Sequence, residues 1–131
     1  MVDRMIEARL DRGGLRAAFD ASMRTPCVAE KLAGTTFEDF DARVEDMRVL
    51  SFYDGEQPIG AAVFQGRIGH IGVLQAYHGK WANRTVLRAI SDAWGNGPQA
   101  LVDVRNDKAL IFTAKLGLRP VRQDGYMVRF Q

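Results

Sequence analysis

The segment from Ile68 to Ile90 constrains the fold of this chain most strongly, because it predicts a buried strand joined to an amphipathic helix by a short basic turn, Tyr77-His78-Gly79-Lys80. No Asp or Glu occurs between Glu56 and Asp92, although the chain has 16 acidic residues. The acid-free stretch contains the following cationic residues and histidines: Arg67, His70, His78, Lys80, Arg84 and Arg88. A strand that enters a helix in this way directs unpaired N–H groups outward at the positive end of the helix dipole. The segment therefore predicts a site for a phosphorylated ligand, or alternatively an ordinary turn beside a solvated basic face.

Length and composition limit the class of protein. A chain of 131 residues fits one domain, residues 1–131. The net charge of +2 is too small to predict nucleic acid as a partner. Cys27 is the one cysteine, which excludes an intramolecular disulfide and argues against a zinc cluster. No stretch approaches 18 apolar residues and the N-terminus has no signal-peptide pattern, so we expect a cytoplasmic protein without a membrane span.

The front third of the chain reads as helical. Apolar residues recur at helical spacing from Leu15 to Met23, and Pro26 is expected to close that element. Thr36, with Asp39 three residues later, resembles a capping box at the start of a second helix.

Three strands are predicted next, as an antiparallel meander over Val49–Tyr53, Ile59–Phe64 and Ile68–Leu74. The Asp54-Gly55 pair between the first two strands is a strong hairpin signal. Gly69 and Gly72 in the third strand indicate a bulge or a close approach by another backbone or a ligand, or alternatively packing against a helix.

The remaining elements complete an α/β pattern. The helix after the basic turn stops at the breakers Gly95–Pro98, and a buried strand is predicted over Ala100–Val104. Asn106 or Asp107 can cap a last helix that ends at Gly117, before a final hairpin over residues 121–130. Helices, a strand meander, and then helix, strand, helix and hairpin predict an α/β domain with a mixed sheet.

Two blocks of sequence resemble the GCN5-related N-acetyltransferase (GNAT) family. Residues 71–80, Ile-Gly-Val-Leu-Gln-Ala-Tyr-His-Gly-Lys, are similar to the family's strand and the start of its pyrophosphate loop. Residues 106–118, Asn-Asp-Lys-Ala-Leu-Ile-Phe-Thr-Ala-Lys-Leu-Gly-Leu, are similar to its Asn-x-x-Ala…Tyr-x-Lys-x-Gly-Phe helix. With the flanking strands, the match covers roughly residues 48 to 130, and it implies a mixed, mostly antiparallel sheet flanked by helices.

The resemblance implies transfer of an acetyl group from acetyl-CoA to an amine. It places the pantetheine arm against the backbone of Ile71, Gly72 and Val73. It places the pyrophosphate on the N–H groups of the loop, which is formed by His78, Gly79, Lys80, Trp81, Ala82, Asn83 and Arg84. Lys80 and Arg84 favour phosphate binding by charge as well as by position. Asn106 is either a helix N-cap or a cofactor contact.

Several residues depart from the family pattern. His78 stands where Arg or Gln is usual, Trp81 where Gly is usual, and Asn83 where Gly or Ala is usual. Thr113 stands where many members carry the Tyr that protonates the leaving thiolate. We expect Trp81 to cover the cofactor groove or a partner surface rather than enter the deep core. Short, divergent members of this kind occur in tailed bacteriophages, some as virion components, and the chain resembles them.

Three residues are candidates for proton transfer. His70 lies on the strand that lines the cleft in this family and can accept a proton near pH 7, or it is a partly buried histidine with a local hydrogen bond. Tyr77 is a core aromatic that anchors the loop, or a donor near the thioester. Tyr126, on the last hairpin, is a substitute for the missing tyrosine acid.

Two functions follow as hypotheses. One is an N-acetyltransferase that acts on an amine of a small molecule or a protein, with the acidic region from Glu30 to Glu56 helping to dock a cationic acceptor. The other is a non-catalytic GNAT-fold structural or interaction protein, for example in a phage virion. A homodimer or a larger protein assembly is compatible with both.

Overall fold

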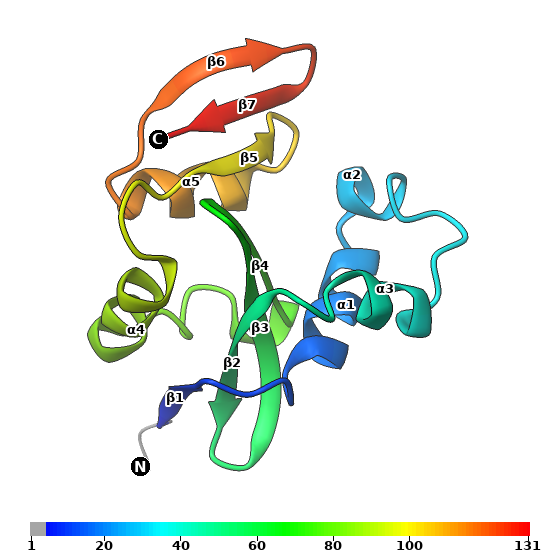
Figure 1. Cartoon of the computed structure of the whole chain (residues 1–131), viewed down its shortest axis with the longest axis vertical. Coiled ribbons are helices and arrows are strands. Elements are labelled where there is room, and N and C mark those ends of the chain that lie inside the picture. The colour runs from blue at the N-terminus through cyan, green and yellow to red at the C-terminus, as the bar shows by residue number, and fades with distance from the viewer. Residues whose placement is uncertain (1–4) are drawn as a thin grey trace.

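The computed structural model describes residues 5–131, which form two antiparallel sheets with helices on both faces (Figure 1). The first sheet has the order β1 (Ile6–Arg9), β2 (Arg48–Asp54), β3 (Gln57–Gln65) and β4 (Ile68–Val73). The second has the order β5 (Ala100–Asp103), β7 (Met127–Phe130) and β6 (Pro120–Asp124). The helices are α1 (Leu15–Met23), α2 (Pro26–Ala29), α3 (Phe37–Arg43), the 3₁₀ turn η1 (Gln75–Tyr77), α4 (Arg84–Trp94) and α5 (Asp107–Lys115).

The predicted strand meander is confirmed as β2, β3 and β4. Ala62 in β3 pairs with Leu50 on one side and Ile71 on the other, which fixes the register of the central strands. Gly55 adopts a φ of +62° in the β2–β3 turn, a conformation that glycine reaches at little cost. Strand β1, which was not predicted from the sequence, pairs antiparallel with β2 and extends the meander to four strands.

Local sequence signals mark the starts of α3 and α2. The Thr36 capping box is present, because its hydroxyl accepts from the Asp39 N–H while the Asp39 carboxylate accepts from the Thr36 N–H, both at 3.1 Å. Pro26 does not simply close α1; it begins the short helix α2, where its missing N–H costs nothing.

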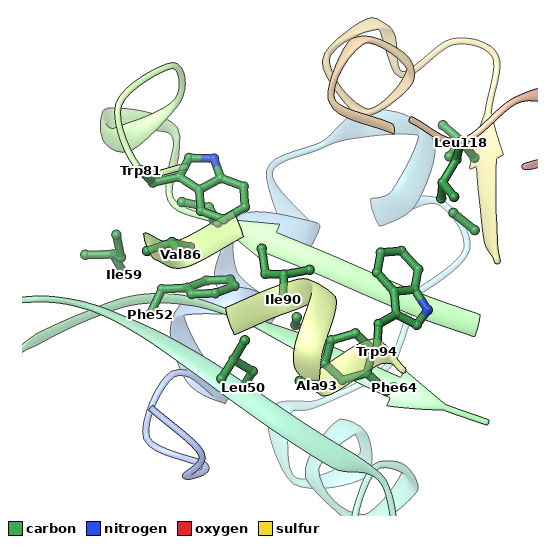
Figure 2. Packing of buried hydrophobic residues seen from close by; sticks show 14 of the residues in the cluster. Leu50, Phe52, Ile59, Phe64, Trp81, Val86, Ile90, Ala93, Trp94 and Leu118 are labelled. Atoms are coloured by element: carbon green, nitrogen blue, oxygen red, sulfur yellow. The ribbon is translucent and has the colours of Figure 1, made fainter. Parts of the chain in front are cut away.

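The larger of two apolar clusters lies between the sheets and helices α4 and α5. It includes Phe52 from β2, Trp81 from the turn after β4, and Val86 and Ile90 from α4, which Figure 2 shows side by side. A smaller cluster on the opposite face packs α1 against β3, with Leu15 and Ala18 meeting Ala61 and Val63. Residues 5–131 contain no helix with the length and apolar character needed to cross a membrane.

The two glycines of β4 accommodate helices, one on each face of the strand. A Cβ added at Gly69 would lie 2.7 Å from the ring of Trp94 in α4. A Cβ added at Gly72 would lie 2.8 Å from the carbonyl oxygen of Ala18 in α1. Packing against a helix is therefore confirmed for both glycines, and at Gly72 the close approach by another backbone is confirmed as well, because the nearest atoms belong to the main chain of Ala18.

Candidate functional site

The two sheets meet where β4 and β5 begin, and they diverge from there. A parallel bridge joins Ile68 to Gln99. Two hydrogen bonds accompany it, from the Gly69 N–H to the Gln99 carbonyl at 3.0 Å and from the Gln99 N–H to the Arg67 carbonyl at 2.8 Å. Beyond this bridge no ladder connects the two strands within the described residues, and Figure 1 shows β5 beside only one end of β4. We call this region the β4–β5 divergence.

The main-chain N–H and C=O groups of β4 point alternately toward β3 and toward the divergence. In an antiparallel ladder, alternate residues direct their N–H and C=O to the same neighbour. Arg67 and Gly69 bond toward β5, whereas the Leu74 N–H bonds to the Ile59 carbonyl on the β3 side at 2.9 Å. Ile71 and Val73 lie two and four residues after Gly69, so their N–H and C=O groups also face the divergence.

Gly72 differs from the expectation for this strand. It is paired with Ala61 and, like Leu74, directs its N–H and C=O groups to β3 rather than to the divergence.

The turn after β4 already uses some of the N–H groups expected to face a phosphate. The N–H groups of His78, Lys80 and Asn83 donate to the carbonyls of Gln75, Tyr77 and Trp81, at 3.0–3.1 Å. Within the part of the chain that the structure describes, four N–H groups of this segment have no such bond: those of Gly79, Trp81, Ala82 and Arg84. Among the described residues, four of the seven N–H groups expected to bind the phosphate are therefore still free of main-chain hydrogen bonds.

Trp81 lies in the core, contrary to the expectation that it covers a groove. It is only 7% exposed, and its ring centroid lies 4.9 Å from that of Phe52 and 5.0 Å from that of Phe112. The polar neighbours of Trp81 in the sequence suggested an exposed indole. Two aromatic partners from β2 and α5 offer it more apolar contact than the surface does.

The side chains at the start of α4 divide into one cap and two exposed cations. The Asn83 Oδ1 accepts from the Val86 N–H at 2.8 Å, and its Nδ2 donates to the Ile6 carbonyl of β1 at 3.1 Å. Asn83 therefore caps α4 and ties it to the first strand. Lys80 and Arg84 are exposed and form no ion pair within residues 5–131.

His78 bridges the segments that follow β4 and β5. Its Nε2 lies 2.8 Å from the Val73 carbonyl oxygen, and its Nδ1 lies 3.1 Å from the Lys108 Nζ in the first turn of α5. A carbonyl can only accept and an ammonium can only donate, so the geometry assigns a neutral imidazole with its proton on Nε2. Sequence reasoning did not find Lys108, which lies 30 residues from His78.

The hydroxyls of Tyr77 and Thr113 both have hydrogen-bond partners within the protein. The Tyr77 hydroxyl donates to Asp54 Oδ2 at 2.8 Å, and the residue is buried. Of its two predicted roles, these contacts support the core aromatic that anchors the loop, rather than the proton donor. The Thr113 hydroxyl is buried and donates to the Ala109 carbonyl at 2.7 Å. Asn106 caps α5 by accepting from the Ala109 N–H at 3.3 Å, which confirms its capping role.

His70 and Tyr126 remain accessible. His70 points to the α1 face of β4, as Gly72 does, and desolvation by the surrounding protein lowers the pKa of its imidazole below the usual value. Tyr126 is 61% exposed and its ring lies under the Arg105 guanidinium at 4.4 Å. The Val104 N–H donates to the Tyr126 carbonyl at 2.8 Å, which places this tyrosine beside the end of β5.

A charge cluster at the end of β5 was not predicted. Asp103 is buried and accepts from Arg105 at 2.7 and 2.9 Å and from Lys31, after α2, at 3.3 Å. The hydrogen bonds from Arg105 hold the pKa of Asp103 far below its usual range, despite burial. Arg105 also pairs with Glu30. The cluster connects the segment after α2 to the open end of the divergence. It could not be predicted because Lys31 and Asp103 are 72 residues apart.

Comparisons with known proteins identify the fold. No protein-family model and no curated protein matches the sequence. Among solved structures, an acetyltransferase from Thermus thermophilus has a TM-score of 0.68 at 18% identity, covering 99% of this chain and 97% of that chain. A GCN5-related N-acetyltransferase from Rhodopseudomonas palustris has a TM-score of 0.69 at 18% identity, covering 99% and 94%. The chain has the GNAT fold.

A third neighbour is the PaiA N-acetyltransferase from Thermoplasma acidophilum, solved in complex with coenzyme A. It has a TM-score of 0.69 at 14% identity, with 96% of this chain and 97% of that chain covered. The GNAT fold expected from the two sequence blocks is thereby confirmed over nearly the whole chain rather than over residues 48–130 alone.

Proposed function

We propose that the chain is an N-acetyltransferase that binds acetyl-CoA in the β4–β5 divergence and transfers the acetyl group to an amine of a small molecule or a protein. The observation that carries this proposal is the pair of residues Ile71 and Val73, whose N–H and C=O groups face the divergence. The pantetheine arm contains two amides and can pair with these groups as an added strand would. The coenzyme A complex of the Thermoplasma neighbour supports this choice of ligand.

The cations at the start of α4 suit the phosphates of the same ligand. Lys80 and Arg84 are exposed and supply positive charge, and the unpaired N–H groups of Gly79, Ala82 and Arg84 lie in the same turn. The positive end of the helix dipole adds to this attraction.

Acetyl transfer requires a base for the acceptor amine and an acid for the departing thiolate. A base takes a proton from the acceptor ammonium, and the amine nitrogen then attacks the thioester carbon. The C–S bond breaks, the nitrogen loses its second proton to solvent as the amide forms, and the CoA thiolate takes a proton from an acid. His70 is suited to the first task because its lowered pKa keeps the imidazole neutral at pH 7. Tyr126 is suited to the second, because its hydroxyl has no hydrogen-bond partner within the described residues.

A non-catalytic GNAT-fold interaction protein, such as a virion component, is the second candidate. It is favoured by the internal partners of the Tyr77 and Thr113 hydroxyls, which remove two of the available proton donors. This candidate retains the fold and requires no turnover.

Binding and turnover together test the proposal. Acetyl-CoA at 100 times its dissociation constant should stabilise the protein by about 2.7 kcal/mol. Lys80→Ala and Arg84→Ala should each weaken CoA binding by about 1.5–3 kcal/mol in calorimetry, as expected for charge-assisted hydrogen bonds. Arg24→Ala, after α1 on the opposite face of the sheet, serves as the matched control and should leave the affinity unchanged.

Release of free thiol with a panel of amines then separates the two candidates. Turnover that is lost in Tyr126→Phe would support the enzyme and its proposed acid. CoA binding without thiol release from any amine would favour the non-catalytic candidate. No CoA binding would refute both the site and the activity.

A further inference from the structure

The contacts of His78 with the Val73 carbonyl and with Lys108 form a link across the β4–β5 divergence. His78 follows β4 and Lys108 lies in α5, which follows β5, so the imidazole connects the chain segments that continue from the two diverging strands. Outside this link and the bridge at Ile68 and Gln99, these strands do not pair with each other within residues 5–131. The link is therefore placed where an extended ligand lying along β4 must pass.

The link occupies a group that the proposed ligand needs. The Val73 carbonyl faces the divergence, and it already accepts a hydrogen bond from His78 Nε2, with 2.8 Å between the nitrogen and the oxygen. An amide N–H of a pantetheine arm paired with β4 would use this same carbonyl. The arm would then compete with the imidazole for this carbonyl oxygen.

The electrostatics of the link make it easy to displace. Lys108 is the second residue of α5, where the helix dipole disfavours a cation, and its partner His78 is neutral in this arrangement. Asp107, one residue earlier, is the acidic group of this first turn, and it forms no ion pair with Lys108 among the described residues. Because the hydrogen bond between Lys108 and His78 is exposed, water can replace either partner when it breaks, which lowers its net contribution.

We propose that His78, held by Lys108, is a latch that competes with the pantetheine arm of the cofactor for the Val73 carbonyl. This inference rests on the proposed function and adds a competing group to it. A ligand with an amide arm must open the latch, whereas a nucleotide without that arm leaves the latch closed. The latch thus lowers the affinity for the intact cofactor by the free energy needed to open it, and it leaves the affinity for the nucleotide half unchanged.

Two ligands and two variants test the latch. Calorimetry compares CoA with adenosine 3′,5′-bisphosphate, which keeps the nucleotide phosphates and lacks pantetheine. His78→Ala removes the ring while leaving the main chain, and it should bind CoA roughly 2- to 10-fold more tightly, the worth of one net hydrogen bond. The same variant should bind the bisphosphate with unchanged affinity. Gln75→Ala, an exposed residue of the same connection, is the matched control and should change neither affinity.

A second measurement observes the ring directly. The chain has two histidines, so a long-range ¹H–¹⁵N spectrum of the imidazoles resolves His78 after assignment with His78→Ala. At pH 8 the ligand-free protein should show His78 as the Nε2–H tautomer. CoA should shift its ring nitrogens as the bond to Val73 breaks, and the bisphosphate should not.

The outcomes are distinct. Weaker CoA binding in His78→Ala would make His78 a cofactor contact and overturn the latch, and so would an equal gain for both ligands. Binding of CoA without any change in the His78 ring would overturn it as well, with the proposed function intact. Failure of CoA to bind the wild-type protein and both variants would instead refute the proposed function on which the latch rests.

Discussion

Replacing Trp81 tests the finding that this residue belongs to the core rather than to a ligand groove. An indole buries about 200 Å², which at about 25 cal/mol per Å² corresponds to about 5 kcal/mol of apolar transfer free energy. Trp81 is 7% exposed and contacts the rings of Phe52 and Phe112 at 4.9 and 5.0 Å, so nearly all of this applies. Trp81→Ala retains one methyl group and should lower the free energy of unfolding by about 3–5 kcal/mol.

Urea denaturation followed by circular dichroism measures this loss. A domain of ordinary stability has about 5–15 kcal/mol, so Trp81→Ala can fall close to the unfolding threshold. Trp81→Phe provides a safer second variant and should lose about 1–2 kcal/mol, because most of the ring surface is kept. Combining Trp81→Phe with Phe112→Leu in a double-mutant cycle should reveal a coupling of about 0.5–1.5 kcal/mol between the two rings. A loss below about 1 kcal/mol in Trp81→Ala would refute the core placement.

Three further substitutions probe β4 and α5. Gly72→Ala should destabilise the protein by about 1–3 kcal/mol in denaturant, because the new Cβ would lie 2.8 Å from the Ala18 carbonyl oxygen; a neutral result would mean that α1 packs less closely. Thr113→Tyr should lower stability by about 1–3 kcal/mol without raising turnover, since the position is buried; a faster enzyme would contradict this placement. The folded-state pKa of His70 lies below the unfolded value of about 6.5, so the unfolded chain binds more protons and stability should fall as the pH drops below about 6.5. In His70→Gln the urea midpoint should lose part of this pH dependence, and an unchanged profile would show that His70 is not desolvated.

Much of the fold could be predicted because its signals are local. The Asp54-Gly55 turn, the Thr36 capping box and the glycine at position 117 act over a few residues and mark the ends of elements directly. The strand β1 was missed because Ile6–Arg9 is short and charged, and it becomes a strand by pairing with β2 more than 40 positions away.

The candidate site was predicted only in part, for the same reason. The sequence identified β4 and the basic turn, but the direction of each N–H group depends on which neighbour the strand pairs with. The environment of Trp81 is set by Phe52 and Phe112, and that of His78 by Lys108, none of which is a sequence neighbour. Charge and polarity near a residue therefore indicated its exposure poorly where distant aromatic or ionic partners were present.

The divergence also affects which strand edges of the protein are open to pairing with another chain. Unpaired strand edges invite pairing with other chains, and proteins often protect them with charge, proline or short length. The outer edge β1 has four residues and includes Glu7 and Arg9, while β6 begins at Pro120 and carries Arg122. The inner edge of β4 has no acidic or basic residue other than His70, but the bridge from Ile68 to Gln99 occupies its start and His78 contacts the Val73 carbonyl at its end. Both contacts leave fewer free main-chain groups on that edge for pairing with the strand of another chain.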